Sequence, residues 1–410
     1  MSLELSGMEN RTKRHIVIVG GGFAGIAAAH SLHRLTNRGV RISLIDPSPT
    51  FVFAPTLVDY ALGRTVRPPE FSLRRALEPR GVEVVRGYLS TVDLERRLIS
   101  GEDLEMGYDA LLIATGGRPD STTIPGASGE GRHNHYIVGQ TSAQDVANAV
   151  TALEANDGRI VVGLVPGASY VSAMYELALG LELALRRRHI RERNPITFVT
   201  PEPFLGDFGL GQTAARDHFE KLFRDHDIDV RANTRITRVD RDAVFLNSDE
   251  QIETTASFLM PAFTGSVDIW KSAGLTDDRG FVPVNHLYRH VHTPEVFAVG
   301  IAAIFSDEIA PLGARRAPQT GFLSTRMGRI AAVNIAATLG FGDYAARTLP
   351  HLVDARILDL GESGLLLTSR GATQLRHHAA PVPGWSAHVL KRGSARYLTH
   401  CLARGWLRWM

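Results

Sequence analysis

A glycine-rich turn near the start of the chain has the spacing of a dinucleotide-binding site. Residues 20–25 read GGGFAG and fit G-x-G-x-x-G, directly after the apolar run IVIV and directly before a helical pattern. Glycines let the backbone approach a pyrophosphate closely, and the helix N-terminus adds free N–H groups and a partial positive charge. Asp46 ends the next strand, where its carboxylate can accept hydrogen bonds from ribose hydroxyls. The predicted contacts of the turn are Gly20, Gly22, Phe23, Ala24 and Gly25.

Two later segments indicate which dinucleotide the turn holds, since FAD and NAD both use such a turn. Residues 113–117 read IATGG, and a strand that ends in ATG in such a domain is typical of two-dinucleotide flavoproteins. Residues 296–300 read VFAVG, a late segment that returns backbone N–H groups to the flavin. Together with the turn, these segments favour FAD in the first domain. They add Thr115, Gly116, Gly300 and the following Ile301 to the predicted contacts.

A second strand–turn–helix pattern begins at Arg159 but lacks the phosphate-binding spacing. After RIVVG the turn continues as GLVPG at residues 163–167. Pro166 removes an N–H donor, and Leu164 and Val165 bring side chains to the place where a phosphate would approach. We therefore expect no NADH in this turn and interpret it as a vestigial unit kept for packing.

Alternating apolar runs and helical patterns position these turns in two α/β units. Buried strands that alternate with helices predict parallel sheets, so the expected fold class is α/β with two Rossmann-like, doubly wound domains. The run PEVFAVG looks like a strand that returns to the first unit, which makes the second unit an insertion. The predicted domains are an FAD-binding domain at 13–118 and 285–345, a second Rossmann-like domain at 119–284, and a C-terminal segment at 346–410.

Composition argues against several classes of function. The 410 residues carry a formal net charge of +2, so no overall field favours nucleic acid as a partner. The single cysteine, Cys401, excludes an intramolecular disulfide and a catalytic dithiol. The histidine pairs, His133 with His135 and His377 with His378, have no cysteine or carboxylate at metal-ligand spacing. No stretch reaches the roughly 18 apolar residues that span a bilayer, so any membrane contact would lie on the surface.

Several segments resemble the sulfide:quinone oxidoreductases and flavocytochrome c sulfide dehydrogenases, which are two-dinucleotide-binding flavoproteins. The resemblance runs from about residue 13 to the C-terminus. Most two-dinucleotide flavoproteins have aspartate after the glycine of VFAVG, whereas this chain has Ile301 and in this resembles the sulfide:quinone branch. The segments that carry the resemblance are PGASxxxAMYE at 166–176, ITFVTPEPFLGDFGLG at 196–211, MPAFxG at 260–265, VFAVGIA at 296–302 and APQTGFxxxxMG at 317–328.

This resemblance implies FAD in the first domain, a quinone near the C-terminal side, monotopic membrane attachment and three cysteines that oxidise sulfide. By register, Gln140, Tyr170 and Arg356 stand where those cysteines belong. Sulfide oxidation of that kind needs thiolates, which amide, phenol and guanidinium groups cannot replace, so we predict that this reaction is lost. The three residues could instead hold an anionic organic substrate on one face of the flavin. The alternative is that the phenol and the guanidinium only fill space and pair with Glu176 or Asp359.

Two further loops resemble family segments that lie against the flavin. Pro55 belongs to FVFAP at 51–55, which resembles the loop against the isoalloxazine. Gln319 and Thr320 lie where the family has a lysine next to Thr-Gly, and a glutamine donates a hydrogen bond but no charge. We therefore expect a lower flavin potential. Type II NADH dehydrogenases also have a glutamine near this place, which leaves an NADH:quinone reductase as an alternative.

Residues 387–410 read as an amphipathic helix without an acidic residue. The predicted apolar side consists of Leu390, Leu398, Leu402, Trp406 and Trp409. The predicted basic side consists of Lys391, Arg392, Arg396, Arg404 and Arg408. Such a helix lies at the headgroup boundary of an anionic membrane, where tryptophan is favoured. The alternative is a helix docked on the core or on a dimer partner.

The sequence therefore predicts a membrane-surface flavoprotein that passes two electrons from an unidentified donor through FAD to a quinone. The chemistry would be the cofactor's, and the protein would supply binding, orientation and electrostatic tuning. We expect the protein at the cytoplasmic face of a membrane or in the cytoplasm, and a homo-oligomer is left open. The alternatives are an NADH:quinone reductase and a non-catalytic flavin-binding or membrane-associated protein.

Overall fold

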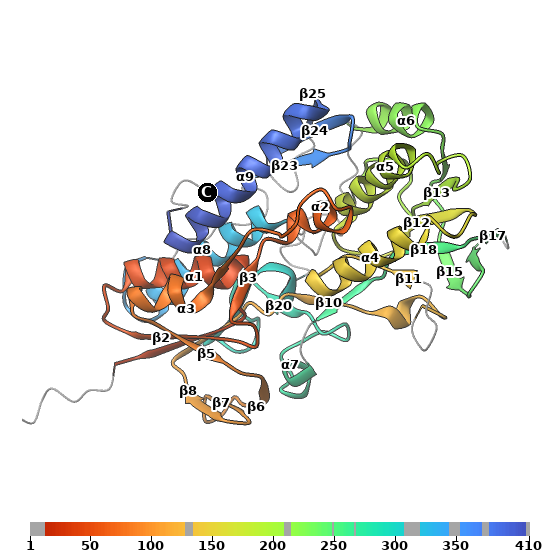
Figure 1. The fold of residues 1–410 in the computed structure, drawn as a ribbon. Helices are drawn as coiled ribbons and strands as arrows, with labels where there is room; N and C mark the ends of the chain where they lie inside the picture. Colours follow the sequence, from red (N-terminus) through yellow and green to blue (C-terminus); the bar gives the residue numbers. More distant parts are fainter. Residues whose placement is uncertain are drawn as a thin grey trace, which may run out of the picture.

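Two parallel β-sheets, each packed against helices, form the two halves of the computed structural model (Figure 1). One long C-terminal helix, α9 (Gly384–Arg404), runs along both halves and contacts elements of each. The predicted α/β class with Rossmann-like sheets is therefore confirmed. The structure describes residues 13–127, 134–208, 215–247, 250–265, 268–306, 320–343, 353–370 and 377–406.

The first sheet contains the strand that leads into the glycine-rich turn. Its central strands are short apolar runs that are buried on both faces, as expected for a parallel sheet covered on two sides. Strand β21 pairs with β9 in parallel, so a segment that follows the second sheet in sequence completes the first. The strand order is β21 (Val296–Ala298), β9 (Ala110–Ile113), β1 (His15–Val19), β2 (Arg41–Asp46) and β5 (Val82–Arg86).

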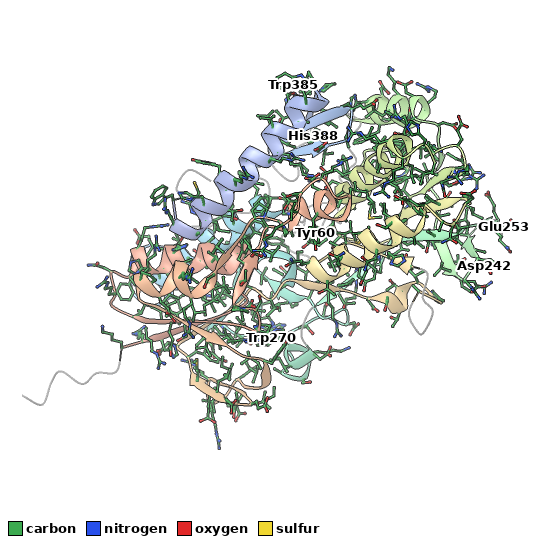
Figure 2. The ribbon with its side chains drawn as sticks, viewed as in Figure 1. Tyr60, Asp242, Glu253, Trp270, Trp385 and His388 are labelled. Atoms are coloured by element: carbon green, nitrogen blue, oxygen red, sulfur yellow. The ribbon has the colours of Figure 1, made fainter. Side chains whose placement is uncertain are left out.

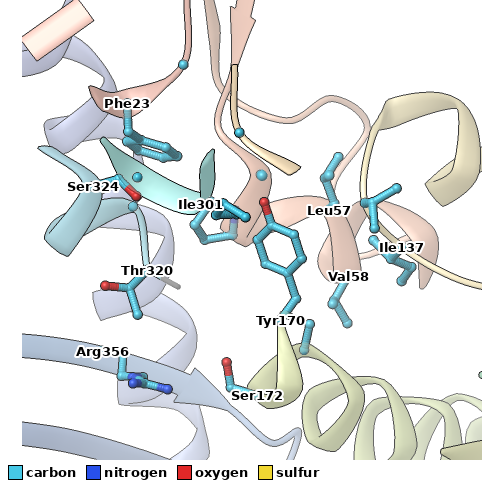
Figure 3. Close-up of a pocket in the computed structure, with 18 of the residues that line it drawn as sticks. Phe23, Leu57, Val58, Ile137, Tyr170, Ser172, Ile301, Thr320, Ser324 and Arg356 are labelled. Atoms are coloured by element: carbon cyan, nitrogen blue, oxygen red, sulfur yellow. The ribbon is translucent and has the colours of Figure 1, made fainter. Parts of the chain in front are cut away.

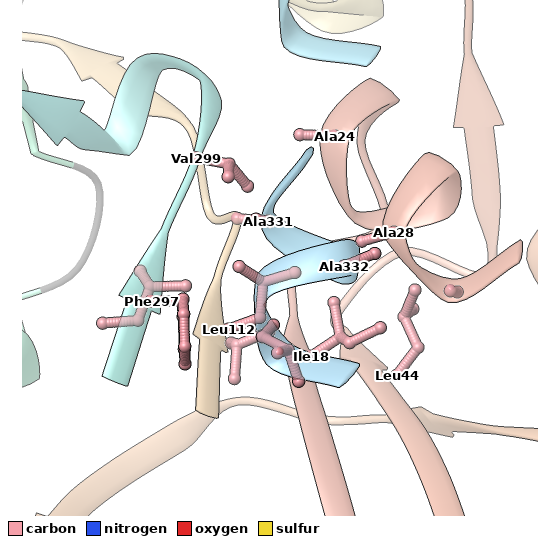
Figure 4. Close-up of a cluster of buried hydrophobic side chains, with 14 of the residues drawn as sticks. Ile18, Ala24, Ala28, Leu44, Leu112, Phe297, Val299, Ala331 and Ala332 are labelled. Atoms are coloured by element: carbon pink, nitrogen blue, oxygen red, sulfur yellow. The ribbon is translucent and has the colours of Figure 1, made fainter. Parts of the chain in front are cut away.

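The core of this half lies between the sheet and two helices, α1 (Phe23–Leu35) and α8 (Gly321–Thr338). The two helices pack closely because small residues line their contact. A Cβ atom on Gly328 of α8 would lie only 2.1 Å from the carbonyl oxygen of Ala24. Figure 4 shows alanines of both helices above aliphatic side chains from neighbouring strands. This packing fixes the N-terminus of α1 at the end of the sheet.

The second sheet repeats the arrangement with different strands and helices. Its core holds a cluster of aromatic rings around Tyr175, whose ring centroid lies 4.9 Å from that of Phe198 and 4.6 Å from that of Phe219. The strand order is β11 (Asn134–His135), β18 (Ala256–Met260), β12 (Ile160–Leu164), β13 (Ile196–Val199) and β14 (Ile228–Arg231). The helices are α4 (Gln140–Ala152), α5 (Val171–Arg187) and α6 (Arg216–Asp225).

Shorter elements connect and edge the two halves. The short helices are α2 (Leu57–Ala61), α3 (Leu73–Leu77) and α7 (Asp268–Ser272), with 3₁₀ turns at Ala54–Thr56, Glu78–Arg80, Ser121–Thr123 and Gly300–Ala302. The two-stranded sheets pair β3 (Thr50–Val52) with β4 (Glu70–Ser72), β10 (Gly117–Pro119) with β19 (Phe263–Gly265), and β20 (Val282–Val284) with β22 (Ala303–Phe305). The antiparallel three-stranded sheets are β6 (Leu89–Asp93), β7 (Leu98–Gly101) and β8 (Leu104–Gly107), then β15 (Ile236–Val239), β16 (Ala243–Leu246) and β17 (Gln251–Glu253), and finally β23 (Val353–Asp359), β24 (Ser363–Arg370) and β25 (His377–Pro383).

The C-terminal helix corrects the faces that the sequence predicted for it. Leu402 is buried in the first core and Leu398 packs against that core, so these two members of the predicted lipid-facing stripe contact protein, whereas Leu390 and Trp406 are exposed as predicted. Lys391, predicted on the outer basic side, is also buried. The end of the helix is tied to α1, because the His30 ring contacts the carbonyl oxygen of Leu402 at 2.9 Å. Helical periodicity identifies a stripe but not the surface that covers it.

The outward-facing side chains of the same helix include part of the predicted stripe and others beside it. Trp385, Val389, Leu390 and Tyr397 are exposed, as is Trp406 just beyond the helix end. The predicted residues Arg408 and Trp409 lie outside the described part of the chain. No helix within the described ranges is long and apolar enough to cross a membrane.

Candidate functional site

A cavity of about 240 Å³ lies where the carboxyl ends of the first sheet meet α5, β23 and α9 (Figure 3). Ligands of open α/β sheets bind at this end of the strands. Elements far apart in sequence build its walls. The lining residues that the argument uses are Gly22, Phe23, Ala24, Pro55, Gly116, Tyr170, Ser172, Glu176, Gly300, Ile301, Thr320, Arg356 and Lys391.

The glycine-rich turn is closed behind and open toward this cavity. Gly20 has φ +112°, and a Cβ atom there would lie 2.3 Å from the carbonyl oxygen of Ala114. A Cβ atom on Gly25 would lie 1.9 Å from the carbonyl oxygen of Gly20. In contrast, no atom lies within 4 Å of a Cβ built on Gly22, which caps α1 and lines the cavity. The turn therefore leaves room for a pyrophosphate at the helix N-terminus, as a dinucleotide requires.

Asp46 lies directly against the turn. Its Oδ2 accepts a hydrogen bond of 2.6 Å from the Gly21 N–H, and its Oδ1 accepts one of 2.7 Å from the Ser48 N–H. Burial raises the pKa of Asp46, and the two N–H donors oppose that shift. Each carboxylate oxygen keeps a lone pair, so binding of a ribose hydroxyl is geometrically open and stays a prediction.

The remaining predicted flavin contacts lie on the segments that follow β3, β9 and β21 and on the start of α8. Thr115 has a buried hydroxyl without a hydrogen-bond partner in the described part of the chain, which fits a site that receives a polar ligand group. Thr320 caps α8 by accepting a hydrogen bond from the Leu323 N–H at 3.2 Å, and it lines the cavity. Gly116, Gly300, Ile301 and Pro55 also line the cavity. Gln319 lies outside the described residues.

The second strand–turn–helix unit is closed by its own neighbours. The Val165 N–H donates to the Met260 carbonyl at 3.2 Å, and the Phe263 N–H donates to the Gly167 carbonyl at 3.1 Å. Leu164 and Val165 are buried, so their side chains occupy the interior of the turn as predicted. The turn has no equivalent of the open face of the first turn, which argues against a phosphate there.

Glu202, the acidic residue after the second strand of this unit, already accepts hydrogen bonds from protein groups. Glu202 accepts hydrogen bonds from the Tyr175 hydroxyl at 2.5 Å, the Thr200 hydroxyl at 2.8 Å and the Phe208 N–H at 2.6 Å. In a dinucleotide-binding unit a carboxylate at this place binds ribose. Here it joins the core instead, which adds to the case against NADH in this half.

Tyr170 brings the second unit into the site of the first. It precedes α5 in the left-handed conformation, with φ 56°, which is uncommon for a bulky residue. Figure 3 shows its ring extending from the start of α5 into the cavity, with the hydroxyl toward Ile301. The hydroxyl has no hydrogen-bond partner among the described residues, and burial raises its pKa. Tyr170 is therefore available to a bound molecule.

Of the three residues at the cysteine positions, two reach the cavity and one does not. Arg356 lines the cavity from β23, with its guanidinium 5.6 Å from the centre of the Phe208 ring. Gln140 is exposed as the first residue of α4, so its predicted place in the site is wrong. Ile137 and Val138, just before this helix, line the cavity in its place. The loop enters α4 after those residues, which turns the glutamine outward.

A buried pair of charges at the cavity was not predicted from the sequence. The Lys391 ammonium of α9 donates to Glu176 Oε1 of α5 at 2.8 Å and lies 3.4 Å from Asp59 Oδ2. Side chains of all three are at most 7% exposed. Glu176 also accepts a 2.8 Å hydrogen bond from the Asp359 N–H. The carboxylate expected to pair with Arg356 or Tyr170 is thus paired with Lys391, and only the fold brings α5 and α9 together.

Burial and charge act in opposite directions on this pair. Burial raises the pKa of Glu176 to about 7, although the Lys391 ammonium opposes the shift. The surrounding carboxylates raise the pKa of Lys391 in spite of its burial. Lys391 is therefore a fixed cation, and Glu176 can gain or lose a proton near neutral pH.

The only cysteine lies away from this chemistry. Cys401 is 2% exposed and belongs to the core between α9 and the first sheet. It follows Lys391 on the same helix by ten residues, which is about 15 Å along a helix axis. Within the described ranges, no group of three histidine, cysteine, aspartate or glutamate side chains is placed to hold a metal ion.

Comparisons with known proteins agree with this geometry. The sequence pattern of the pyridine nucleotide-disulphide oxidoreductases matches residues 14–328. The chain is 30% identical over 397 residues to a sulfide-quinone reductase of Aquifex aeolicus, covering 94% of this chain and 90% of the relative. It is 28% identical over 255 residues to a type II NADH:quinone oxidoreductase of Mycobacterium tuberculosis, covering 56% and 51% of the two chains. The solved structure of the sulfide:quinone oxidoreductase of Aquifex aeolicus superposes with a TM-score of 0.86 at 27% identity, covering 96% and 92% of the two chains.

Proposed function

The chain belongs to the pyridine nucleotide-disulphide oxidoreductase family, as an FAD-dependent oxidoreductase of the sulfide-quinone reductase type, and we propose that it delivers electrons to a quinone from a donor other than sulfide. When bound, FAD accepts two electrons from a donor and releases them to an acceptor. Three features of the site fit FAD: the open turn at Gly22, the Thr115 hydroxyl that has no partner among the described residues, and the Asp46 carboxylate.

The buried pair Glu176–Lys391 carries the proposal of a quinone acceptor. A quinone that gains two electrons also gains two protons, so its site needs a proton donor in an apolar setting. Glu176 lines a cavity whose other walls include Leu57, Val58 and Ile357, and burial sets its pKa near 7. A protonated Glu176 can donate to a quinone oxygen, and the Lys391 ammonium then stabilises the carboxylate that remains. The names of the relatives support a quinone, since both are named as quinone-linked enzymes.

A donor other than sulfide follows from the residues at the cysteine positions. Tyr170 and Arg356 line the cavity, and neither can form a persulfide or disulfide. Cys401 is buried in α9 and cannot replace a thiol there. A guanidinium and a phenol hydroxyl bind a carboxylate or another anionic oxygen by hydrogen bonds. We therefore propose a small organic anion as the donor.

NADH is the second candidate donor, favoured by the similarity to a type II NADH:quinone oxidoreductase. The closed second turn and the internal hydrogen bonds of Glu202 argue against it. A reductase of this kind would need another nucleotide site.

The outer side of α9 supports contact with a membrane surface. Trp385, visible at the end of the helix in Figure 2, is 73% exposed, Tyr397 is 54% exposed and Trp406 is 54% exposed. Arg392 and Arg396 are exposed between them. Aromatic rings and cations on one side of a helix fit the headgroup region of an anionic bilayer, from which quinones are drawn.

The test is anaerobic reduction followed by reoxidation of the purified flavoprotein. The protein is mixed with sulfide, NADH and a panel of small organic acids, and the flavin absorption band is followed. Photoreduced protein is then mixed with a water-soluble quinone. We expect rapid reoxidation by the quinone and reduction by an organic acid but not by sulfide. Failure of the quinone to reoxidise the flavin would contradict the proposed acceptor, and rapid reduction by sulfide would contradict the proposed donor class.

A further inference from the structure

Glu176 and Lys391 belong to a larger buried cluster that reaches the surface. Asp59 lies against Lys391, and the Arg64 guanidinium lies 3.6 Å from Asp59 Oδ1 and 3.8 Å from Asp359 Oδ1. The Asp359 carboxylate is hydrogen-bonded to the ring of His388. His388 is the one member of the cluster with a clearly accessible side chain, at 29% exposure, and Figure 2 shows it on α9.

The cluster itself carries one more carboxylate than permanent cations, so one added proton neutralises it. Its three carboxylates, Asp59, Glu176 and Asp359, face two permanent cations, Arg64 and Lys391. An uncompensated negative charge is unfavourable in a buried site, and one bound proton would neutralise it. Glu176, whose pKa burial raises to about 7, is the carboxyl at the cavity that can hold this proton, and His388 is the side chain of the cluster that solvent reaches. The other charged groups nearby are Arg356, which lines the cavity, and Arg392, whose guanidinium donates to the Arg64 carbonyl at 2.8 Å.

We propose that His388 and Asp359 take up protons from solvent and deliver them to Glu176, so that His388 is a positioning and proton-supplying residue for quinone reduction. This inference rests on the proposed function. Each quinone would take two electrons and one proton from a bound reduced flavin, so one further proton is needed to complete the two O–H bonds of the quinol. That proton comes from the Glu176 carboxyl, whose O–H bond breaks. The His388 imidazolium then loses its ring proton and restores the carboxyl group.

The distances allow water to complete the path. The buried Nη1 and Nη2 atoms of Arg64 and the Oδ1 atom of Asp59 have no hydrogen-bond partner within the described residues. The separations of 3.6 and 3.8 Å are ion-pair distances that exceed a direct hydrogen bond, so these atoms keep hydrogen-bonding capacity that a bound water could use. Asp359 lies beside both ends, because its carboxylate faces His388 and its backbone N–H donates to Glu176. That N–H fixes the position of the Glu176 carboxylate but does not carry the proton, which bound water next to Asp59 and Arg64 would have to carry.

The variant His388→Gln tests the proposal, with His400→Gln as the control. His400 is an exposed histidine on the same helix and lies outside the cluster. We expect H388Q to bind FAD normally. We expect a water-soluble quinone to reoxidise it about tenfold more slowly above pH 7, a smaller change than the roughly hundredfold loss expected when a direct general acid is removed. Added imidazole should restore most of the rate. Equal rates for H388Q, H400Q and the unchanged protein would overturn the proposal.

A second readout does not depend on turnover. The infrared band of the protonated Glu176 carboxyl, identified by its loss in Glu176→Gln, is followed after a rapid change of pH in the oxidised protein. H388Q should slow the exchange of this proton about tenfold, and H400Q should not. Unchanged exchange in H388Q would overturn the path. The protein without substitutions could exchange the Glu176 proton rapidly, with slow exchange in H388Q, and yet not be reoxidised by quinone. In that case the proposed function fails while the proton path stands.

Discussion

The two strand–turn–helix units of this protein have the same topology and opposite uses. In the first, the turn at 20–25 is closed behind by Ala114 and open in front of Gly22. In the second, hydrogen bonds to β18 and to the start of β19 close the turn at 163–167, and no open face remains. The first unit offers backbone N–H groups to a ligand. The second offers side chains from the start of α5.

This difference shows how a dinucleotide-binding unit can become the wall of its neighbour's site. Tyr170 and Glu176 both lie on the second unit, and both line the cavity above the first turn. Glu202, placed like a ribose-binding residue, instead receives three hydrogen bonds from its surroundings. A fold alone therefore does not say which half binds a cofactor, because function depends on the groups that the turn leaves free.

Gly22→Asp should give the largest effect and separates the two turns. An aspartate side chain would point into open space where the pyrophosphate belongs. Two like charges about 4 Å apart repel by ~4 kcal/mol at an effective dielectric constant of 20, so FAD affinity should fall by roughly a thousandfold. Flavin content and fluorescence titration of the apoprotein measure the loss. Full flavin content in this variant would show that the first turn is not the cofactor site.

The matched change in the second turn is Gly167→Ala. Gly167 has φ +83°, so an alanine there is strained and should cost about 1 kcal/mol of stability. It should leave FAD affinity unchanged, because this turn faces protein. Loss of flavin from G167A without loss of fold would mean that both turns take part in binding.

Lys391→Met should lower the free energy of unfolding by about 3 kcal/mol, since it leaves buried carboxylates without their cation. Chemical denaturation at pH 8 measures the change. Arg396→Met, an exposed position on the same helix, is the control and should change stability by less than about 0.5 kcal/mol. Equal effects of the two variants would show that the Glu176–Lys391 pair does not hold α9 to the second unit.

The sequence predicted most of the first unit but little of this cluster. The spacing, together with the flanking strand and helix, predicted Gly20, Gly22 and Asp46 as cofactor contacts, because local geometry sets what a phosphate-binding turn requires. It also predicted the closure of the second turn from Pro166 and its apolar neighbours. The Glu176–Lys391 pair joins residues 215 positions apart, and no local pattern reports such a contact. Leu398, Leu402 and Lys391 of α9 lie against protein rather than outside for a related reason, since leucines suit a protein core as well as a lipid surface.

The pH dependence of quinone reduction tests whether α5 supplies the proton donor, Glu176, as well as lining the cavity. A proton donor works when protonated, and burial raises the pKa of Glu176 to about 7. The rate of reoxidation by quinone should therefore be full below pH 7 and fall as the pH rises through 7. Glu176→Gln should be about a hundredfold slower at pH 6 and should lose this dependence, as expected for removal of a general acid. An unchanged profile in E176Q would exclude Glu176 as the donor.

Two tyrosines on the second unit give the smallest effects and the finest comparison. The Tyr175 hydroxyl donates to Glu202 and accepts from the Gly206 N–H, so Tyr175→Phe should cost about 2 kcal/mol of stability. The Tyr170 hydroxyl faces the cavity and makes no such bond within the described part of the chain, so Tyr170→Phe should change stability by less than about 0.5 kcal/mol. Thermal and chemical unfolding measure both. The flavin spectrum or the apparent affinity for the donor should change in Y170F and not in Y175F. The reverse pattern would mean that the start of α5 only packs against the cavity, and that the second unit adds no binding group to the first.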